Sequence, residues 1–289
     1  MTKNVTIAGL GAMGSKMAEV YLDHGYEVTV WNRTAAKADP LVARGAVRAD
    51  TAATGSLILL SQVDYRSMYD SLGDADLSGK VLVNLSSDTP QTLREAARWV
   101  SERGGELVTA GIMVPPPGIG QPGAYSFYSG DESLVEQHRQ TLEVLGEVKF
   151  MGEDHGLAMA YYTASLHLFF STLAAFMQGA ALVGDAGKFL PFAQETMVEL
   201  GGDGPMGYLK ILAREIEQGV YPGGENNMHM MAVSMEHILH ASKDAGLDVT
   251  LPAALSEVMN RTVDSGHAAD GLGSVYEVIR PRNRSISSA

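Results

Sequence analysis

The stretch Val5-Thr6-Ile7-Ala8-Gly9-Leu10-Gly11-Ala12-Met13-Gly14 decides the fold of this 289-residue chain. Residues 5–8 are mostly apolar and predict a buried strand, and residues 15–24 predict a helix that ends at Gly25. Between them, the glycine spacing allows a tight turn at Gly9, close approach of backbone N–H groups to a pyrophosphate at Gly11, and close packing of helix on strand at Gly14. A second predicted strand, 27–31, follows at the expected distance. Residues 9–14 therefore predict a dinucleotide site at a helix N-terminus.

The residues after the second strand indicate which dinucleotide binds. NAD sites usually carry Asp or Glu there, which accept hydrogen bonds from the ribose hydroxyls. This chain instead has Asn32, Arg33 and Thr34, with Lys37 one helical turn further on. The planar Arg33 guanidinium can bind a 2′-phosphate, and Asn32 and Thr34 are neutral donors. The pattern predicts NADPH/NADP as cofactor; the alternative is that Arg33 and Lys37 are solvated loop charges.

The composition narrows the classes of function. The length fits two domains, and 45% hydrophobic residues suffice for a sizeable core. With 21 Lys and Arg against 34 Asp and Glu, the net charge is −13, which disfavours nucleic acid and anionic membranes as partners and tolerates cationic amines. No cysteine is present, and His237 and His240 lack an evident third ligand, so no metal site is expected. The start of the chain lacks a signal-peptide pattern, which predicts a cytoplasmic protein.

Strand and helix patterns alternate over residues 1–154, which predicts a parallel sheet covered on both faces. The predicted strands cover residues 5–8, 27–31, 57–60, 81–85, 107–108 and 125–128, and a helix is predicted over 35–44. The domain is expected to end near residues 148–150. Ligands bind such sheets at the carboxyl ends of the strands. Candidate cofactor contacts there are Val63, Ser86, Ile112 and Val114, and candidate substrate contacts are Ser87 and Pro116. The three prolines 115–117 form either a rigid apolar wall beside the nicotinamide or a plain structural loop.

Residues 156–184 contain no Asp, Glu, Lys or Arg and predict a helix of about 43 Å. Its length and apolar composition would also suit a membrane span, but polar residues lie along the segment and flanking basic residues are missing. A helix buried on all sides fits better, and a monomer of this size could hardly cover it. The segment therefore predicts a homodimer. The rest of the chain is predicted to be helical over 188–200, 207–218, 228–245, 251–265 and 270–279, with a frayed tail over 280–289.

Several segments resemble a known family. VTIAGLGAMG (5–14), VTVWNRT (28–34) and VNLSSDTP (83–90) are similar to the β-hydroxyacid dehydrogenase superfamily. Within it, GIMVPPPGIGQPGAYSFYSG (111–130) resembles the NADPH-dependent imine reductases, as do residues 236–252 and 265–271. The resemblance implies an α/β Rossmann domain (1–154), a long interdomain helix (155–185) and an all-α dimerisation and substrate domain (186–289). It also implies a domain-swapped homodimer, with each active site between one subunit's Rossmann domain and the other's helices.

The chain departs from the parent superfamily on the long helix. Hydroxyacid dehydrogenases carry a lysine there and an asparagine four residues later, whereas this chain has Tyr162 and Leu166. A substrate that is already a cation, an iminium, needs no lysine, and Tyr162 matches the tyrosine group of the imine reductases. The resemblance thus implies reduction of cyclic imines or iminium ions to amines, with reductive amination left open. The alternatives are an NADP-dependent 3-hydroxyacid dehydrogenase and a non-catalytic NADP-binding protein.

Tyr162 is the predicted catalytic residue. It could donate a proton or a hydrogen bond to the substrate, or it could only orient the substrate or a water molecule. The alternatives are that Tyr162 merely packs in the helix, or that His167 transfers the proton. The remaining predicted pocket residues come from the long helix and from the helical domain of the second subunit, where plain helix core is the alternative. They are Leu166, Phe169 and Phe170, joined by Tyr208, Met230, Met231 and His237.

Overall fold

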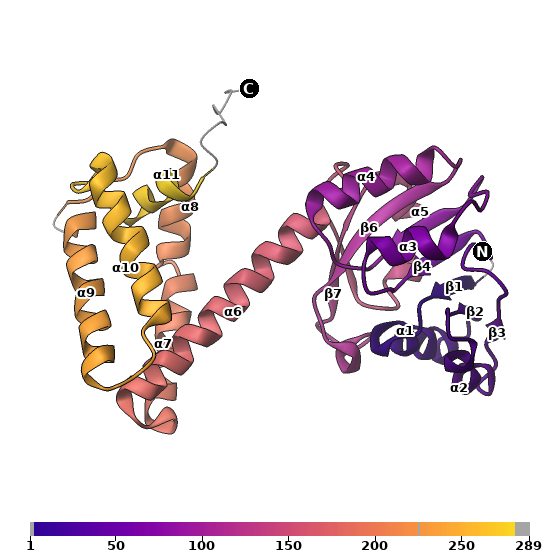
Figure 1. Ribbon diagram of the computed structural model, residues 1–289, viewed down its shortest axis with the longest axis horizontal. Coiled ribbons are helices and arrows are strands. Elements are labelled where there is room, and N and C mark those ends of the chain that lie inside the picture. Colours follow the sequence, from indigo (N-terminus) through magenta and orange to yellow (C-terminus); the bar gives the residue numbers. More distant parts are fainter. Residues whose placement is uncertain (1–2, 225, 281–289) are drawn as a thin grey trace. The chain divides into compact units, whose positions relative to one another are not determined.

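The computed structural model describes residues 3–224 and 226–280 and divides into two units, Met1–Leu168 and Phe169–Ala289. The first unit contains a sheet with helices, and the second contains helices (Figure 1). The boundary falls inside one long helix, α6 (Leu157–Val183). Most of the predicted frayed tail, 281–289, lies outside the described residues.

The first unit is built on an eight-stranded sheet in the order β3-β2-β1-β4-β5-β6-β7-β8. All neighbouring strands are parallel except β6 and β7. The exception arises because a loop connects β6 to β7, whereas a parallel neighbour would need a crossover helix. The strands are β1 (Asn4–Ala8), β2 (Glu27–Trp31), β3 (Val47–Arg48), β4 (Leu57–Leu60), β5 (Val81–Asn84), β6 (Glu106–Ile112), β7 (Tyr125–Ser129) and β8 (Glu147–Phe150).

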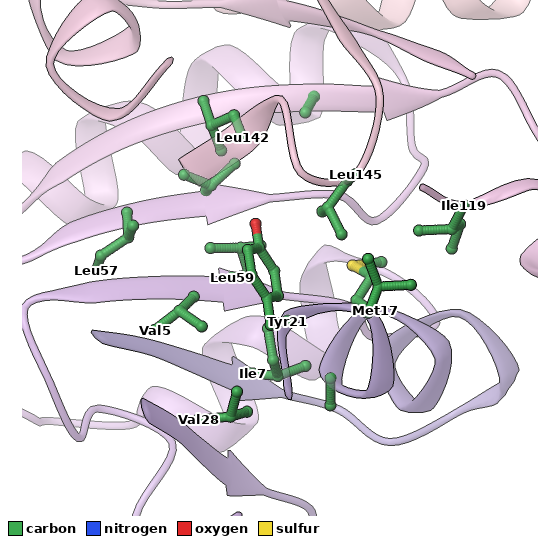
Figure 2. Close-up of a cluster of buried hydrophobic side chains, with 14 of the residues drawn as sticks. Val5, Ile7, Met17, Tyr21, Val28, Leu57, Leu59, Ile119, Leu142 and Leu145 are labelled. Carbon is green, nitrogen blue, oxygen red and sulfur yellow. The ribbon is translucent and has the colours of Figure 1, made fainter. Parts of the chain in front are cut away.

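Helices cover both faces of this sheet, as the sequence predicted. One face packs on α1 (Ala12–Asp23), α2 (Asp39–Val42) and α5 (Glu132–Leu142), with Tyr21 of α1 fully buried among strand residues (Figure 2). The other face packs on α3 (Tyr65–Leu72), α4 (Pro90–Ser101) and Met159 of α6. In β4, Leu57 and Leu59 contribute to the first core and Ile58 and Leu60 to the second, because successive strand residues point to opposite faces.

The helix predicted over 35–44 is not continuous. A 3₁₀ turn, η1 (Ala35–Ala38), precedes the short α2. Pro40 explains the break, because it has no N–H for the bond that an α-helix would make to the carbonyl of Ala36. The short strand β3, which the sequence pattern did not predict, follows this segment and pairs with β2.

The second unit contains four further helices of eleven residues or more, and α9 and α10 pack side by side in it (Figure 1). The predicted helix 251–265 instead ends at Thr262 in the π-type turn η3 (Val263–His267), where Gly266 has φ +97°. The predicted helix 270–279 begins late, because Asp270 pairs with Pro222 as an isolated bridge. The elements are α7 (Ala186–Gly201), α8 (Tyr208–Gln218), α9 (Met228–Asp244), α10 (Thr250–Thr262), η4 (Leu272–Ser274) and α11 (Val275–Ile279).

Helix α6 is long and apolar enough to cross a membrane, judged by length and composition alone. From Phe169 onward, none of its residues is buried within this single chain. Phe170 and Met177, for example, are each 62% exposed. The second half of α6 therefore presents an apolar surface that one copy of the chain leaves uncovered.

Candidate functional site

The glycine turn lies where the strand order reverses. From the adjacent strands β1 and β4, the chain continues outward in opposite directions across the sheet. In open α/β sheets, ligands bind at the carboxyl ends of the strands at such a point. Gly9 has φ +102°, and a Cβ there would lie 2.2 Å from the carbonyl oxygen of Ser61; a Cβ on Gly14 would lie 1.8 Å from the carbonyl oxygen of Gly9. The turn and packing reasons for these two glycines are thus confirmed.

The N-terminus of α1 is open to a ligand. A Cβ on Gly11 would meet nothing within 4 Å. The first bond of the helix runs from the N–H of Ser15 to the carbonyl of Gly11, 2.9 Å away. The N–H groups of Ala12, Met13 and Gly14 are therefore the donors that a helix start leaves without intrahelical partners. This arrangement suits a phosphate group.

Asn32 connects the glycine turn to the loop after β2. Its Oδ1 accepts the N–H of Leu10 at 2.9 Å, and its Nδ2 donates to the carbonyl of Thr34 at 3.0 Å. The N–H of Gly9 also bonds to the carbonyl of Trp31 at 2.9 Å. The sequence predicted Asn32 as a donor to a 2′-phosphate, whereas in the structure its amide already fixes the two loops relative to each other.

Arg33 and Lys37 lie on the surface of that same loop. Both side chains are exposed, and neither forms an ion pair within residues 3–224 and 226–280. The acidic side chain that follows, Asp39, is paired with Arg48. The hydroxyl of Thr34 makes no capping bond to η1. The loop thus presents two cations and a hydroxyl to an anionic group.

A hydrogen bond connects the loop after β4 to the loop after β5. Ser86 is 2% exposed, and its Oγ accepts the N–H of Gln62 at 3.2 Å. Its own N–H donates to Oδ1 of Asn84 at 2.8 Å. Ser86, predicted as a cofactor contact, therefore supports the loop that carries Val63 instead of presenting its hydroxyl outward. Val63 is 86% exposed, and Ser87 is exposed as well.

The residues after β6 are half-buried. Ile112 and Val114 pack against the core beneath α1, which leaves only part of each side chain for a ligand. Pro116 begins the 3₁₀ turn η2 (Pro116–Gly118), closed by a bond from the N–H of Gly118 to the carbonyl of Pro115 at 2.8 Å. Both the structural-loop and the apolar-wall interpretations of the prolines are compatible with this turn.

Tyr162 lies on the first part of α6 against β6. A Cβ on Gly111 would come within 3.0 Å of Cγ and Cδ2 of Tyr162, so the ring rests on the glycine backbone. Tyr162 is half-buried, and its hydroxyl forms no hydrogen bond with any residue that the structure describes. Gly111 directly precedes Ile112, which brings the predicted catalytic residue to a strand end. Leu166, one turn further along α6, is half-buried, and His167 is exposed.

The predicted residues of the second unit lie mostly on its surface. The rings of Phe169 and Phe170 are exposed and form an edge-to-face pair with centroids 5.4 Å apart. Met230 and His237 are both exposed and, being seven residues apart, share one face of α9, while Met231 is half-buried. The hydroxyl of Tyr208 accepts a bond from Nδ2 of Asn226 at 3.4 Å.

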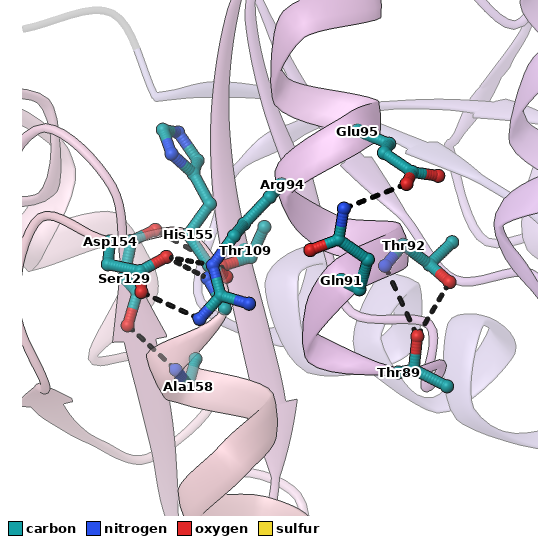
Figure 3. Close-up of polar contacts among 11 residues, drawn as sticks. Thr89, Gln91, Thr92, Arg94, Glu95, Thr109, Ser129, Asp154, His155 and Ala158 are labelled. Atoms are coloured by element: carbon teal, nitrogen blue, oxygen red, sulfur yellow. Dashed lines mark hydrogen bonds and ion pairs between the residues drawn. The ribbon is translucent and has the colours of Figure 1, made fainter. Parts of the chain in front are cut away.

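Polar contacts that the sequence analysis did not predict surround the N-terminus of α6 (Figure 3). Arg94 of α4 donates from Nε and Nη2 to the two carboxylate oxygens of Asp154, each at 2.7 Å. The guanidinium lowers the pKa of Asp154 to about 2. Within the described residues, no group of three or more His, Asp or Glu is arranged to hold a metal ion.

Known protein families match nearly the whole chain. Residues 4–152 match the family model of the NAD binding domain of 6-phosphogluconate dehydrogenase, and residues 154–281 match that of the C-terminal domain of NADPH-dependent reductive aminase-like proteins. The chain is 32% identical to an NADPH-dependent reductive aminase of Aspergillus oryzae, over 97% of this chain and 98% of that protein.

Two solved structures are similar over nearly their full length. An imine reductase from Bacillus cereus is 42% identical with a TM-score of 0.89, over 95% of this chain and 98% of that chain. A reductive aminase from Aspergillus terreus, in complex with NADPH4, cyclohexanone and allyl amine, is 34% identical with a TM-score of 0.86, over 97% and 100% of the two chains.

Proposed function

Because the chain belongs to the family of NADPH-dependent reductive aminases and imine reductases, we propose that it reduces cyclic imines and iminium ions to amines with NADPH. The observation that carries the proposal is the match of both domains over almost the whole chain, combined with Tyr162 at the strand end of β6. Reductive amination of ketones is the natural extension, since the similar Aspergillus terreus structure contains a ketone and an amine.

The residues of the first unit fit an NADPH molecule. The open N-terminus of α1, with the N–H groups of Ala12 to Gly14, would hold the pyrophosphate. Arg33 and Lys37 would hold the 2′-phosphate, with the Thr34 hydroxyl beside them. Val63, Ile112 and Val114 supply apolar surface at the strand ends. When bound, the cofactor supplies the hydride that adds to the carbon of the C=N bond.

The substrate side needs no cationic residue. An iminium nitrogen is already positive, so a lysine at position 162 would repel it, whereas the hydroxyl of Tyr162 can hold a proton or a hydrogen bond at the nitrogen. The half-buried position of Tyr162 on Gly111 fixes that hydroxyl without burying it. Leu166, Ser87 and Pro116 would line the remainder of the pocket on this unit.

A homodimer completes the proposed site. The second half of α6 is uncovered in one chain, and an apolar groove of about 480 Å³ runs between α6 and α7, lined by Thr172, Leu173, Phe176, Leu190, Ala193, Gln194, Met197 and Val198. We assign residues 155–185 as the interdomain helix between a Rossmann domain (1–154) and a helical domain (186–289) exchanged between subunits. The second subunit then provides Tyr208, Met230, Met231 and His237, while Phe169 and Phe170 lie on the interdomain helix that also carries Tyr162.

This assembly also accounts for the apolar length of α6. The helix lies inside the matched C-terminal domain, so burial between subunits explains its composition without a membrane. A cytoplasmic location is part of the same proposal.

The test uses two assays of the purified protein. The first measures NADPH oxidation with a cyclic imine as substrate. The second measures NADP reduction with a 3-hydroxy acid as substrate. Imine reduction without hydroxyacid oxidation is expected, and the opposite pattern would overturn the assignment. Tyr162→Phe should lower turnover about tenfold or more while the Kd for NADPH stays unchanged. If that variant turns over like the parent, Tyr162 has no chemical role.

A further inference from the structure

The start of α6 is held by contacts from three separate elements of the first unit (Figure 3). We define the α6 anchor as Arg94, Thr109, Ser129, Asp154 and His155. Arg94 comes from α4, Thr109 from β6 and Ser129 from β7, and all five residues lie within the first unit. The segment 154–158 is thereby bonded at almost every residue.

The outer part of the anchor is the bidentate ion pair of Arg94 and Asp154. Oδ1 of Asp154 also accepts the N–H of Gly156 at 2.9 Å, so one carboxylate bonds both α4 and the residue before α6. A Cβ on Gly156 would lie 2.6 Å from Nη2 of Arg94. The guanidinium therefore lies directly against the backbone of Gly156, and a side chain at position 156 would have to displace it.

The inner part of the anchor consists of buried and part-buried hydrogen bonds to the sheet. The hydroxyl of Thr109 donates to the carbonyl of His155 at 2.7 Å, and the His155 ring donates from Nε2 to the carbonyl of Leu107 at 2.9 Å. Oγ of Ser129 accepts the N–H of Ala158 at 2.8 Å, which satisfies one of the donors that a helix start leaves unpaired. These bonds fix the position of the start of α6 along β6 and the rotation of α6 about its own axis.

Tyr162 lies four residues, about one helical turn, beyond Ala158. Its ring rests on Gly111, which follows Thr109 by two residues and so lies on the same face of β6. The α6 anchor and the ring of Tyr162 therefore contact the same face of β6. We propose that the Arg94–Asp154 ion pair positions Tyr162, so that both are positioning residues for imine reduction. The inference rests on the function proposed above for Tyr162.

The decisive experiment is a double-mutant cycle between positions 94 and 162. Arg94→Met keeps an unbranched stem but removes the guanidinium and its ion pair, and it should lower kcat about fivefold or more, since misplacement of a catalytic group by about 1 Å can cost far more. In a Tyr162→Phe background, the same Arg94→Met change should have almost no effect on kcat. KM for NADPH should not change in either background. Arg98→Met, an exposed arginine one turn along α4, is the matched control and should behave like the parent.

A second measurement reports the position of Tyr162 without activity. With 3-fluorotyrosine at position 162, the ¹⁹F resonance should shift in Arg94→Met and in Asp154→Asn but not in Arg98→Met. Arg94→Lys, which keeps the charge but loses the bidentate geometry, should give an intermediate shift. Because the ion pair is on the surface, these variants are expected to fold, and their melting temperatures verify it.

The outcomes separate the two proposals. An unchanged ¹⁹F resonance in Arg94→Met, or an equal loss of kcat with and without the Tyr162 hydroxyl, would overturn the positioning role. A parent protein that reduces no imine would overturn the proposed function, while a shifted resonance would still show that the ion pair controls the position of Tyr162.

Discussion

At the residue scale, we expect the choice of cofactor to depend on Arg33. Its guanidinium lies on the loop after β2, with Lys37 nearby and Asp39 neutralised by Arg48. Arg33→Asp removes the proposed partner of the 2′-phosphate and adds a repelling charge. KM for NADPH should rise about tenfold to a hundredfold, the range for hydrogen bonds to a charged group, and KM for NADH should change little. Arg98→Asp makes the same charge change on α4 and should leave both values as they are; equal increases for both cofactors in Arg33→Asp would rule out the phosphate contact.

A second residue with a clear energetic consequence is Tyr65. Its side chain is fully buried, and its hydroxyl has no hydrogen-bond partner among the described residues. Burial also raises its pKa well above the ordinary value, as expected for a phenol without compensating contacts. Tyr65→Phe removes the desolvated hydroxyl and should increase the free energy of unfolding by about 1 kcal/mol.

Tyr21 provides the matched control for this change. It is equally buried, but its hydroxyl donates to the carbonyl of Thr141 at 3.0 Å. Tyr21→Phe leaves that carbonyl without its partner and should decrease the free energy of unfolding by about 1 kcal/mol, measured by urea denaturation under the same conditions. A loss of stability in Tyr65→Phe similar to that in Tyr21→Phe would show that the Tyr65 hydroxyl has a bonding partner.

At the scale of elements, the sequence predicts those strands and helices whose formation depends on residues close to one another in the chain. The glycine turn before α1 and the charge-free α6 are examples. The prediction of one helix over 35–44 was wrong, because Pro40 interrupts the helical pattern. The antiparallel β7 could not be predicted, since strand direction depends on how a connection returns to the sheet.

The site shows the same division. Residues 9–14 and 32–37 could be predicted as phosphate contacts, because the glycine spacing between a strand and a helix, and the cations after the second strand, are local features of the sequence. The sequence could not show that Asn32 and Ser86 are already bonded to Leu10 and Gln62, because only the fold brings those groups together. Arg94 and Asp154 are sixty residues apart, and no pattern in the chain relates them.

The pH dependence of stability at the start of α6 follows from Asp154. Arg94 lowers its folded-state pKa from 3.8 to about 2, so the ionised form is favoured in the folded protein. The stability from this carboxylate is therefore complete above about pH 4 and is lost as the pH falls through about 2. Asp154→Asn should lower the melting temperature at pH 7, and the difference from the parent should shrink steadily as the pH falls from about 4 through about 2. Glu153→Gln, an exposed neighbour, should follow the parent at every pH; a difference in Asp154→Asn that does not shrink over this range would point to a cause other than ionisation.

At the scale of the whole molecule, we expect a second copy of the chain to cover the exposed half of α6. Met177 is 62% exposed in one chain and lies on α6, beside the apolar groove formed with α7. In an isolated chain Met177→Glu would exchange one solvated side chain for another and cost almost nothing. In the proposed dimer it buries an unpaired carboxylate, which costs several kcal/mol and should dissociate the subunits.

The measurement is the mass in solution by light scattering, together with kcat. The parent should have about twice the chain mass of 30.7 kDa, and Met177→Glu should approach the mass of one chain. Val47→Glu is the matched control, because Val47 is 63% exposed on β3 of the first unit and should leave both mass and kcat unchanged. Turnover should fall with the mass, since the proposed pocket takes Met230 and His237 from the second subunit. A Met177→Glu monomer with full activity would mean that one chain contains a complete site, and the exchanged arrangement of the helical domain would then be wrong.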